Sequence, residues 1–292
     1  MQFLNNMSIM NNYRPNASDI ADKKFGQNFL EDRSIVEKII EAMPEDDLPI
    51  VEIGPGLGDL TQELVRVRSV TAFEVDKRLC GYLEKRFSGA IADGRLRLEC
   101  GDVLKRWEGG SLLEQPYRLV ANLPYYIATT ILLKALRDPH CRSTLTMVQK
   151  EVAEKFAACE GDRNFSALSV LAGSVGEATV RFLVPPEAFN PPPKVDSAVL
   201  EIRKEHSLND EAFEAFLRVA FKQPRKTLMK NLSSVYPKAV LTSLFEEVGL
   251  QQTLRPHQVG TSLYRRIYQA LTKESDHGKK SEPEYGATKP KR

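Results

Sequence analysis

The sequence contains few of the residues from which metal centres and disulfide frameworks are built. Among its 292 residues there are only four cysteines, four histidines and one tryptophan. No two cysteines form a CxxC pair, and none has the spacing to histidine that a zinc site requires. We therefore expect no metal site, no disulfide framework and a reducing compartment. The cysteines are Cys80, Cys100, Cys141 and Cys159.

Long hydrophobic runs are also missing. No segment approaches the roughly 20 apolar residues of a membrane-spanning helix, and the asparagine-rich residues 1–16 lack the basic start and apolar run of a secretory signal. These absences predict a cytoplasmic protein with no membrane partner. We expect residues 1–22 to be disordered or loosely docked, and residues 273–292, which have no apolar period, to form a disordered tail.

Positive charge is concentrated in the last third of the chain. The net charge is only +2, but residues 203–292 hold 17 Lys and Arg against 10 Asp and Glu, whereas the preceding residues hold 24 against 29. Such a distribution suits a polyanion such as nucleic acid, although a basic face is often only solvated. Charge alone leaves both interpretations open.

Short apolar runs alternate with amphipathic stretches through the first two thirds of the chain. Residues 60–67 and 79–87 repeat apolar side chains about every 3.6 positions, which is typical of helices. This alternation predicts βαβ units and therefore an α/β fold with a doubly wound sheet. The predicted buried strands are residues 50–53, 70–75, 96–100, 118–121 and 145–148.

Two further strands are predicted at residues 179–184 and 196–203. The loop between them, residues 185–193, is rich in proline, which lacks the amide hydrogen that a central ladder requires, so we expect an exposed loop. After Glu205 the pattern becomes helical: Phe213, Phe216, Leu217 and Phe221 fall on one helix face, and a second helix is expected from Arg225, after Pro224.

The chain is long enough for one sizeable core and a smaller satellite domain. We expect the α/β domain to cover residues 23–205 and a small helical domain to cover residues 208–272.

A glycine-rich loop follows the first predicted strand. Gly54, Gly56 and Gly58 stand at alternate positions after residues 50–53, where a backbone without side chains lets amide groups approach a ligand. Dinucleotide-binding loops need their third glycine at the position of Asp59, whereas G-x-G-x-G after Glu52 is the usual methyltransferase form. The loop therefore favours a Rossmann-like class I methyltransferase over an NAD enzyme.

Acidic residues end the next two strands. Glu74 lies 20 residues after Gly54, at a spacing that lets its carboxylate accept hydrogen bonds from two ribose hydroxyls. Asp102 follows the third strand and would accept from the adenine amino group of the cofactor. Each residue alone is more often a helix cap or a solvated strand end. Together with the glycine loop they predict a binding site for an adenosyl cofactor at the carboxyl edge of the sheet.

The fourth strand leads into Asn122, Leu123, Pro124 and Tyr125, which match the pattern (Asn/Asp)-x-Pro-(Tyr/Phe) of amino-group methyltransferases. An adenine amino nitrogen is a poor nucleophile until acceptors hold its hydrogens, and the Asn122 side-chain oxygen and Leu123 carbonyl would do so. Pro124 would fix the carbonyl direction, and Tyr125 would stack on the base. The alternative is a strand-to-helix turn with asparagine as the cap.

Phe189, in the proline-rich loop, is a candidate for the other wall of an extruded base. From the sequence alone, a core phenylalanine under the loop is an equally good interpretation. An adenosine deaminase is excluded because HxE and PCxxC are both absent.

With these motifs the chain resembles the ribosomal RNA adenine dimethyltransferases that act on the small subunit. The resemblance covers most of residues 23–272. The matching segments are residues 24–30 (KFGQNFL), 52–58 (EIGPGLG), 74–76 (EVD), 101–102 (GD), 122–125 (NLPY), 149–153 (QKEVA) and 192–199 (PPKVDSAV).

The resemblance implies S-adenosyl-L-methionine as donor, S-adenosyl-L-homocysteine as product and dimethylation of two adjacent adenosines in a hairpin near the 3′ end of small-subunit rRNA. It implies that Asn28 and Leu30 close the cofactor pocket beside Gly54, Glu74, Asp102 and Asn122. It also implies an immature small subunit as partner. We expect a monomer.

The resemblance further implies that a basic segment faces RNA, and phosphate contacts there would give affinity without sequence choice. The segment comprises Lys222, Arg225, Lys226 and Lys230.

This chain departs from the family pattern in two places. After Tyr125 the family usually has a Ser/Thr-Pro pair, whereas this chain has residues 126–130 (YIATT), so we expect a less rigid loop. Residues 257–260 (HQVG) also differ. Two rivals remain: a resistance-type methyltransferase of large-subunit rRNA, and a ribosome-assembly factor with incidental catalysis. Residues 194–199 favour the small-subunit type.

Overall fold

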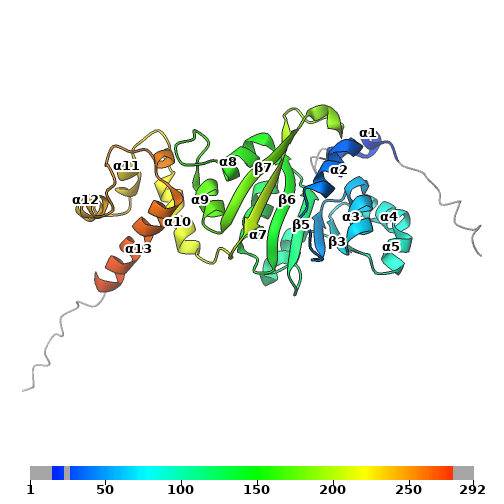
Figure 1. Ribbon diagram of the computed structural model, residues 1–292, viewed down its shortest axis with the longest axis horizontal. Coiled ribbons are helices and arrows are strands. Elements are labelled where there is room, and N and C mark those ends of the chain that lie inside the picture. The colour runs from blue at the N-terminus through cyan, green and yellow to red at the C-terminus, as the bar shows by residue number, and fades with distance from the viewer. Residues whose placement is uncertain (1–14, 23–26, 279–292) are drawn as a thin grey trace, which may run out of the picture. The chain divides into compact units, whose positions relative to one another are not determined.

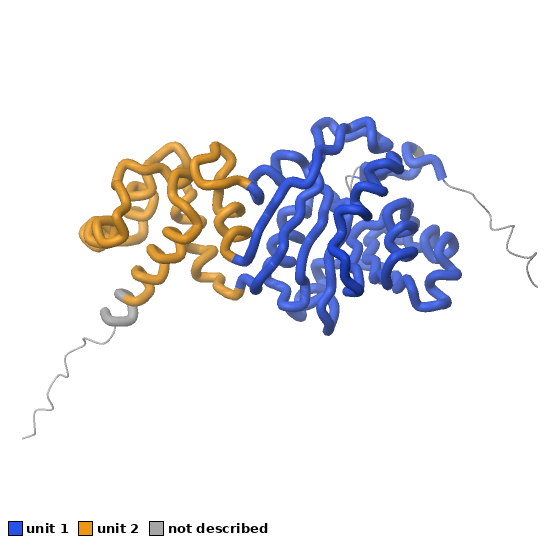
Figure 2. The backbone as a smooth tube through the Cα atoms, in the orientation of Figure 1, with its two compact units in different colours: residues 1–157, 175–208 blue, residues 158–174, 209–292 orange. Residues whose placement is uncertain are grey.

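The computed structural model describes residues 15–22 and 27–278. The chain divides into two compact units, shown in Figure 2. Unit 1 comprises Met1–Ala157 and Val175–Leu208, and unit 2 comprises Ala158–Ser174 and Asn209–Arg292.

Residues 158–174 were expected in the α/β domain, but the structure places them in unit 2. Their helix α9 (Ala167–Gly173) packs against the later helices α10 (Glu211–Ala220) and α13 (Thr261–Gly278). Val170 and Ala172 of α9 are buried there, and the ring centroids of Phe165 and Phe221 lie 6.3 Å apart. Segments far apart in sequence thus share one apolar core, which local periodicity does not reveal.

Unit 1 is built on a seven-stranded sheet of order β4-β3-β2-β5-β6-β9-β7. The first five strands in this order are parallel, and β9 is antiparallel to both β6 and β7. The predicted doubly wound α/β sheet is confirmed (Figure 1). The strands are β2 (Ile50–Ile53), β3 (Val70–Glu74), β4 (Leu96–Cys100), β5 (Tyr117–Asn122), β6 (Cys141–Gln149), β7 (Gly176–Val184) and β9 (Ser197–Lys204).

The helices of unit 1 cover this sheet and bury one apolar stripe each. Ile39 of α2, Leu64 of α3 and Leu83 of α4 join Ile50 and Val120 of the sheet in one core cluster. Every side chain of β2 is buried, which explains why all its residues except Glu52 are apolar. The helices are α2 (Arg33–Glu41), α3 (Asp59–Val67), α4 (Lys77–Arg86), α5 (Ser88–Ala92), α6 (Val103–Arg106), α7 (Ala128–Arg137) and α8 (Lys150–Ala157), with short 3₁₀ turns η2 (Trp107–Gly109) and η3 (Pro186–Ala188).

The N-terminal segment is more ordered than predicted in its described part. Residues 17–20 form the short helix α1 (Ala17–Ile20), capped by the Asn16 side chain, and Ala17 is buried against Phe29 and Leu57. Residues 1–14 lie outside the described part of the chain, as do residues 23–26, which include the start of the 24–30 motif.

A small second ladder crosses from this segment to the proline-rich loop. Strand β1 (Phe29–Leu30) pairs antiparallel with β8 (Phe189–Asn190). The loop was expected to be exposed, but Ala188 and Phe189 are buried. The loop is buried because a tertiary contact, the β1–β8 ladder, holds it against residues 27–30.

Cysteine pairing contradicts the sequence-based expectation. Cys80 of α4 and Cys100 of β4 are joined by a disulfide, with their Cα atoms 6.1 Å apart. Their separation of 20 residues carries no motif, and only the packing of α4 beside β4 brings them together.

Unit 2 is helical, as predicted, and closes around aromatic rings. Phe213 and Phe216 of α10 pack against Tyr268 of α13, with centroids 5.2 and 5.7 Å from its ring. The remaining elements are α11 (Leu228–Leu232), α12 (Lys238–Glu247) and the 3₁₀ turn η4 (Pro256–Gln258).

Two helix boundaries in unit 2 differ from the predictions. The second helix was expected from Arg225, but α11 starts at Leu228 because the Thr227 side chain caps it by accepting from the Lys230 amide. Helix α13 reaches Gly278, so residues 273–278 are helical rather than part of a disordered tail; residues 279–292 lie outside the described part.

Candidate active site

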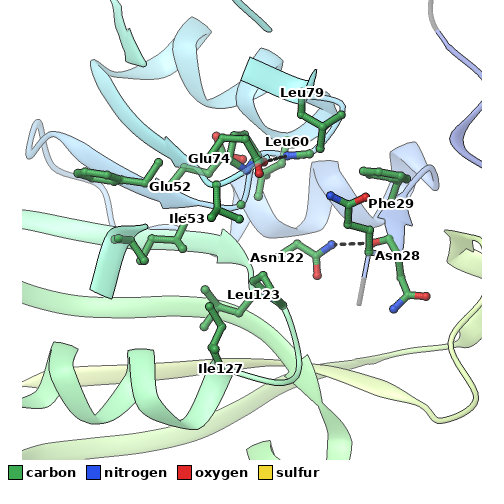
Figure 3. A pocket seen from close by; sticks show the side chains of 18 of the residues that line it. Asn28, Phe29, Glu52, Ile53, Leu60, Glu74, Leu79, Asn122, Leu123 and Ile127 are labelled. Carbon is green, nitrogen blue, oxygen red and sulfur yellow. Dashed lines mark hydrogen bonds between the residues drawn. The ribbon is translucent and has the colours of Figure 1, made fainter. Parts of the chain in front are cut away.

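A cavity of about 360 Å³ opens at the carboxyl edge of the parallel strands. It is lined by the loop after β2, the ends of β3 and β4, the turn after β5 and residues 27–30 (Figure 3). This is the edge at which open α/β sheets bind ligands. The structure gathers here the predicted residues Asn28, Leu30, Gly54, Gly56, Glu74, Asp102, Asn122, Leu123, Pro124 and Tyr125.

The glycine loop forms the floor of the cavity. Gly54, Gly56 and Gly58 have φ angles of 71°, 62° and 82°, in the left-handed region that side chains other than glycine rarely adopt. A methyl group on Gly56 would lie 2.9 Å from Cδ1 of Phe29. The loop thus requires glycine both for its backbone conformation and for the close approach of β1.

Glu74 is held at the end of β3 by backbone amides. Its carboxylate accepts from the Gly56 amide at 3.2 Å and from the Asp76 amide at 2.9 Å. The side chain is buried, and burial raises the pKa of Glu74 despite these hydrogen bonds. The two amides orient the carboxylate beside the glycine loop.

Asp102 is both a helix cap and a cavity residue, the two alternatives that the sequence left open. It caps α6, accepting from the Leu104 amide at 2.9 Å, and it also lines the cavity. Because one carboxylate oxygen is engaged in the cap, the cap itself fixes the direction of the side chain.

Glu52 also lines this cavity, although the sequence analysis named it only as the residue that precedes the glycine loop. Its side chain is 1% exposed, and its Oε2 atom has no hydrogen-bond partner among the described residues. Burial raises the pKa of Glu52 to about 8, with the nearby Glu74 and Asp59 carboxylates adding to the rise. The signal in the sequence that could have identified Glu52 as a site residue is its carboxyl group in an otherwise apolar strand.

The turn after β5 is tied to the N-terminal segment. The Asn122 Nδ2 atom donates to the Asn28 carbonyl at 3.3 Å, and Figure 3 shows the two side by side at the cavity. The Leu123 amide donates to the Met147 carbonyl at 3.0 Å, which continues the pairing of β5 with β6. These bonds fix the turn from both sides.

Tyr125 is anchored by a residue that sequence reasoning did not select. Its hydroxyl lies 2.5 Å from Oγ of Ser197, the fully buried first residue of β9. Burial also raises the pKa of Tyr125. The only sequence signal was that Ser197 falls within the 192–199 motif.

The turn closes without the proline that the family usually has. The Ile127 amide donates to the Pro124 carbonyl at 3.2 Å, and the Ala128 amide donates to the Tyr125 carbonyl at 3.4 Å. Helix α7 begins immediately afterwards. Tyr126 is the first residue of the segment in which this chain differs from the family pattern. It lines the cavity and is 58% exposed.

Phe189 does not join the cavity. Its side chain is 4% exposed and packs in the core cluster with Leu30, Ala188 and Val199. Its strand β8 pairs with β1, which places the ring under the loop. Its position matches a core phenylalanine, so the structure corrects its assignment as the second wall of the base site.

The described residues contain no group of three or more His, Cys, Asp and Glu side chains placed to hold a metal ion. Across that same part of the chain, no helix has both the length and the apolar character needed to cross a membrane.

Comparison with known proteins decides the family. The family model for ribosomal RNA adenine dimethylases matches residues 19–273. The chain belongs to this family. It is therefore a methyltransferase, and its reaction is the dimethylation of adenine in ribosomal RNA.

Two curated relatives are similar over nearly their whole length. The ribosomal RNA small subunit methyltransferase A of Sulfurimonas denitrificans is 59% identical over 249 residues, covering 85% of this chain and 93% of that protein. The protein of the same name from Campylobacter curvus is 45% identical, covering 89% of this chain and 95% of that protein.

Two solved structures share the fold of this adenine dimethylase. A dimethyladenosine transferase from Plasmodium falciparum aligns with a TM-score of 0.72 at 25% identity, covering 85% of this chain and 98% of that one. The 23S rRNA methyltransferase ErmE aligns with a TM-score of 0.66 at 28% identity, covering 84% of this chain and 100% of that one. The predicted Rossmann-like class I methyltransferase fold is thus confirmed.

Proposed function

We propose that this adenine dimethylase transfers methyl groups from S-adenosyl-L-methionine to the 6-amino groups of two adjacent adenosines in a hairpin near the 3′ end of small-subunit rRNA. The observation that carries the proposal is the position of Asn122. Its amide nitrogen is used by Asn28, which leaves its oxygen as the acceptor at the cavity.

The cavity residues fit the adenosyl donor. The glycine loop brings a backbone without side chains to the floor of the cavity, and the buried Glu52 Oε2 atom lacks a partner among the described residues. We assign the ribose hydroxyls to Glu74, the adenine amino group to Asp102, and closure of the pocket to Asn28 and Leu30. When bound, the donor supplies an electrophilic methyl group on a sulfonium, and S-adenosyl-L-homocysteine remains.

The protein's contribution to methyl transfer is to grip and orient the acceptor amine. The Asn122 side-chain oxygen and the Leu123 carbonyl accept its hydrogens, so that the nitrogen lone pair turns away from the ring. Pro124 fixes the carbonyl direction, and Tyr125, held by Ser197, stacks on the base. Holding the reacting atoms in line supplies on the order of 7 to 11 kcal/mol of barrier reduction.

RNA affinity in this proposal comes from the basic segment of unit 2. Lys222 and Lys230 line one hollow of about 510 Å³ together with Lys238, Thr227 and Ser234. Ammonium groups around a hollow with hydroxyl donors suit phosphate oxygens, which give affinity independent of sequence.

We further propose an immature small ribosomal subunit as the partner, a monomeric protein and a cytoplasmic location. The names of the two bacterial relatives support the small subunit. The location rests on the ribosomal substrate.

Mass spectrometry of rRNA tests the proposal. Immature small subunits, mature small subunits, large subunits and free rRNA would each be incubated with isotopically methyl-labelled donor. We expect label as dimethyladenosine at two adjacent positions of small-subunit rRNA only. Label confined to large-subunit rRNA would overturn the proposal in favour of a resistance-type enzyme. Specific binding of immature subunits without label would leave an assembly factor instead.

A further inference from the structure

A second hollow of unit 1, with a volume of about 440 Å³, lies where the end of β6 meets the loop before β9. Gln149 and Lys150 line it from the end of β6 and the start of α8, and Lys194, Val195 and Asp196 line it from the loop before β9. We propose that this hollow binds the nucleotide that neighbours the target adenosine in the RNA strand. The inference rests on the proposed function and adds a subsite to it.

The position of the hollow follows from the strand register. Ser197 pairs with Gln149 in the β6–β9 ladder, and the Lys150 amide donates to the Asp196 carbonyl at 3.0 Å. The two sides of the hollow are therefore joined by main-chain bonds. Ser197 also contacts the Tyr125 hydroxyl at 2.5 Å, so the hollow begins one residue from the anchor of the base-stacking side chain.

This placement matters for a base that must leave its stack. An enzyme that acts on a base draws the nucleotide out of its neighbours, which costs a few kcal/mol, and it must hold the strand in that shape. The target base enters beside Tyr125, with the cofactor cavity on one side. The hollow is next to Tyr125 through Ser197, where the adjoining nucleotide has to be accommodated.

The charges of the hollow leave two ammonium groups available. Neither Lys150 nor Lys194 has an ion-pair partner within residues 15–22 and 27–278. Three carboxylates also line the hollow, those of Glu151, Glu154 and Asp196, and Glu151 is paired with Lys155 at 2.6 Å. The two lysines are the groups of the hollow that suit the phosphate of the proposed substrate.

The other lining groups match the remaining parts of a nucleotide. Gln149 and Asp196 provide a donor and acceptors for a base edge. Val195, which is 46% exposed, and Pro186 provide an apolar surface for a base face. The volume falls within the range of about 300 to 1,000 Å³ that is usual for small-ligand pockets. A bare phosphate would use the lysines but not these groups.

Lysine substitutions test the phosphate half of the inference. In the full-length protein, Lys150→Gln and Lys194→Gln would be combined, and Lys77→Gln with Lys85→Gln is the matched control because both lysines are exposed on α4 and line neither the cavity nor the hollow. The probe is the rRNA that the wild-type protein methylates. We expect the KM for RNA to rise about tenfold in the double variant, and the slope of log KM against log salt to fall by roughly 0.7 to 0.9 per lysine removed.

In the same experiment, kcat and the affinity for S-adenosyl-L-homocysteine should stay unchanged, and the Lys77→Gln, Lys85→Gln control should behave as the wild type. An unchanged KM and salt slope in the double variant would overturn the inference while leaving the proposed function intact. A wild-type protein that methylates no rRNA would instead overturn the proposed function.

An RNA with an abasic neighbour tests the other half. Removing the base next to the target adenosine should raise KM for the wild-type protein. The same removal should have no further effect on a Gln149→Ala, Asp196→Ala variant, because the contacts are already lost. Effects that simply add would show that the hollow does not contact this base and would overturn the inference.

Discussion

The side-chain nitrogen of Asn122 donates a hydrogen bond to the main-chain carbonyl of Asn28, 3.3 Å away and 94 positions earlier in the chain. This contact decides which end of the Asn122 amide faces the cavity. It also ties the turn after β5 to residues 27–30, which line the same cavity.

Replacing Asn122 should separate catalysis from donor binding. We expect Asn122→Ala to lower kcat by at least about 100-fold, since the amine loses an acceptor at the reacting atom, while affinity for S-adenosyl-L-homocysteine stays within several-fold. Single-turnover methylation and calorimetry measure the two quantities. Turnover near the wild-type rate would refute the role assigned to Asn122.

Glu74 should make donor affinity sensitive to pH. Burial raises the pKa of Glu74, so the ionised carboxylate that we assign to the ribose hydroxyls is lost at a higher pH than for an exposed glutamate. Affinity for S-adenosyl-L-homocysteine is expected to fall as pH decreases through that pKa. Glu74→Gln should bind more weakly at neutral pH and show a flatter profile. Identical profiles in the two proteins would contradict the assignment.

Glu52 should make folding stability depend on pH. With its pKa raised to about 8 from an ordinary value of 4.5, folded Glu52 keeps a proton that the unfolded chain loses above about 4.5. The free energy of unfolding should therefore fall as pH rises from about 4.5 towards about 8 and then level off. Urea unfolding across this range should show the slope in the wild type, and Glu52→Gln should reduce it.

The Tyr125 and Ser197 hydroxyls should act as one unit. Their oxygens lie 2.5 Å apart, so Ser197→Ala and Tyr125→Phe each remove the same hydrogen bond. We expect each variant to lower kcat several-fold with little change in donor affinity. The double variant should be no worse than the single ones, because coupled groups are not additive. If the kcat loss of the double variant equals the product of the two single losses, the contact does not position the ring.

The basic segment of unit 2 should control the salt dependence of RNA binding. Changing Lys222, Arg225, Lys226 and Lys230 to Gln together should weaken RNA binding and flatten its salt slope, because phosphate contacts release counterions. The exposed lysines Lys77 and Lys85 of α4 are the matched control. An unchanged slope would remove this segment from the RNA site. Substitution is preferable to deleting residues 208–292, since α9 packs against helices that the deletion removes.

Local patterns predicted much of the α/β unit. The strand from Ile50 to Ile53 was predicted with its observed bounds, because a strand buried on both faces is mostly apolar. The ends of β3 and β4 and the turn at Asn122 were predicted to lie on one sheet edge, since parallel strands present their carboxyl ends together. The order of the strands in the sequence was therefore enough to predict most of the residues that line the cavity.

Other features depended on contacts between distant segments. Ser197 meets Tyr125 only through the antiparallel pairing of β9 with β6, and Cys80 meets Cys100 only because α4 packs beside β4. Phe189 stands in a loop that the sequence marks as exposed, yet its pairing with Leu30 buries it. None of these partners lies within a helical turn or a strand repeat of the other.

The sequence by itself therefore determined the order of strands and helices, the glycine loop and the acidic and amide groups that end the strands. These follow from periodicity and backbone chemistry, which act over a few residues. Tertiary structure alone decided the membership of residues 158–174 in unit 2, the anchor of Tyr125 and the orientation of Asn122. Those depend on burial against segments tens of residues away, which local pattern does not encode.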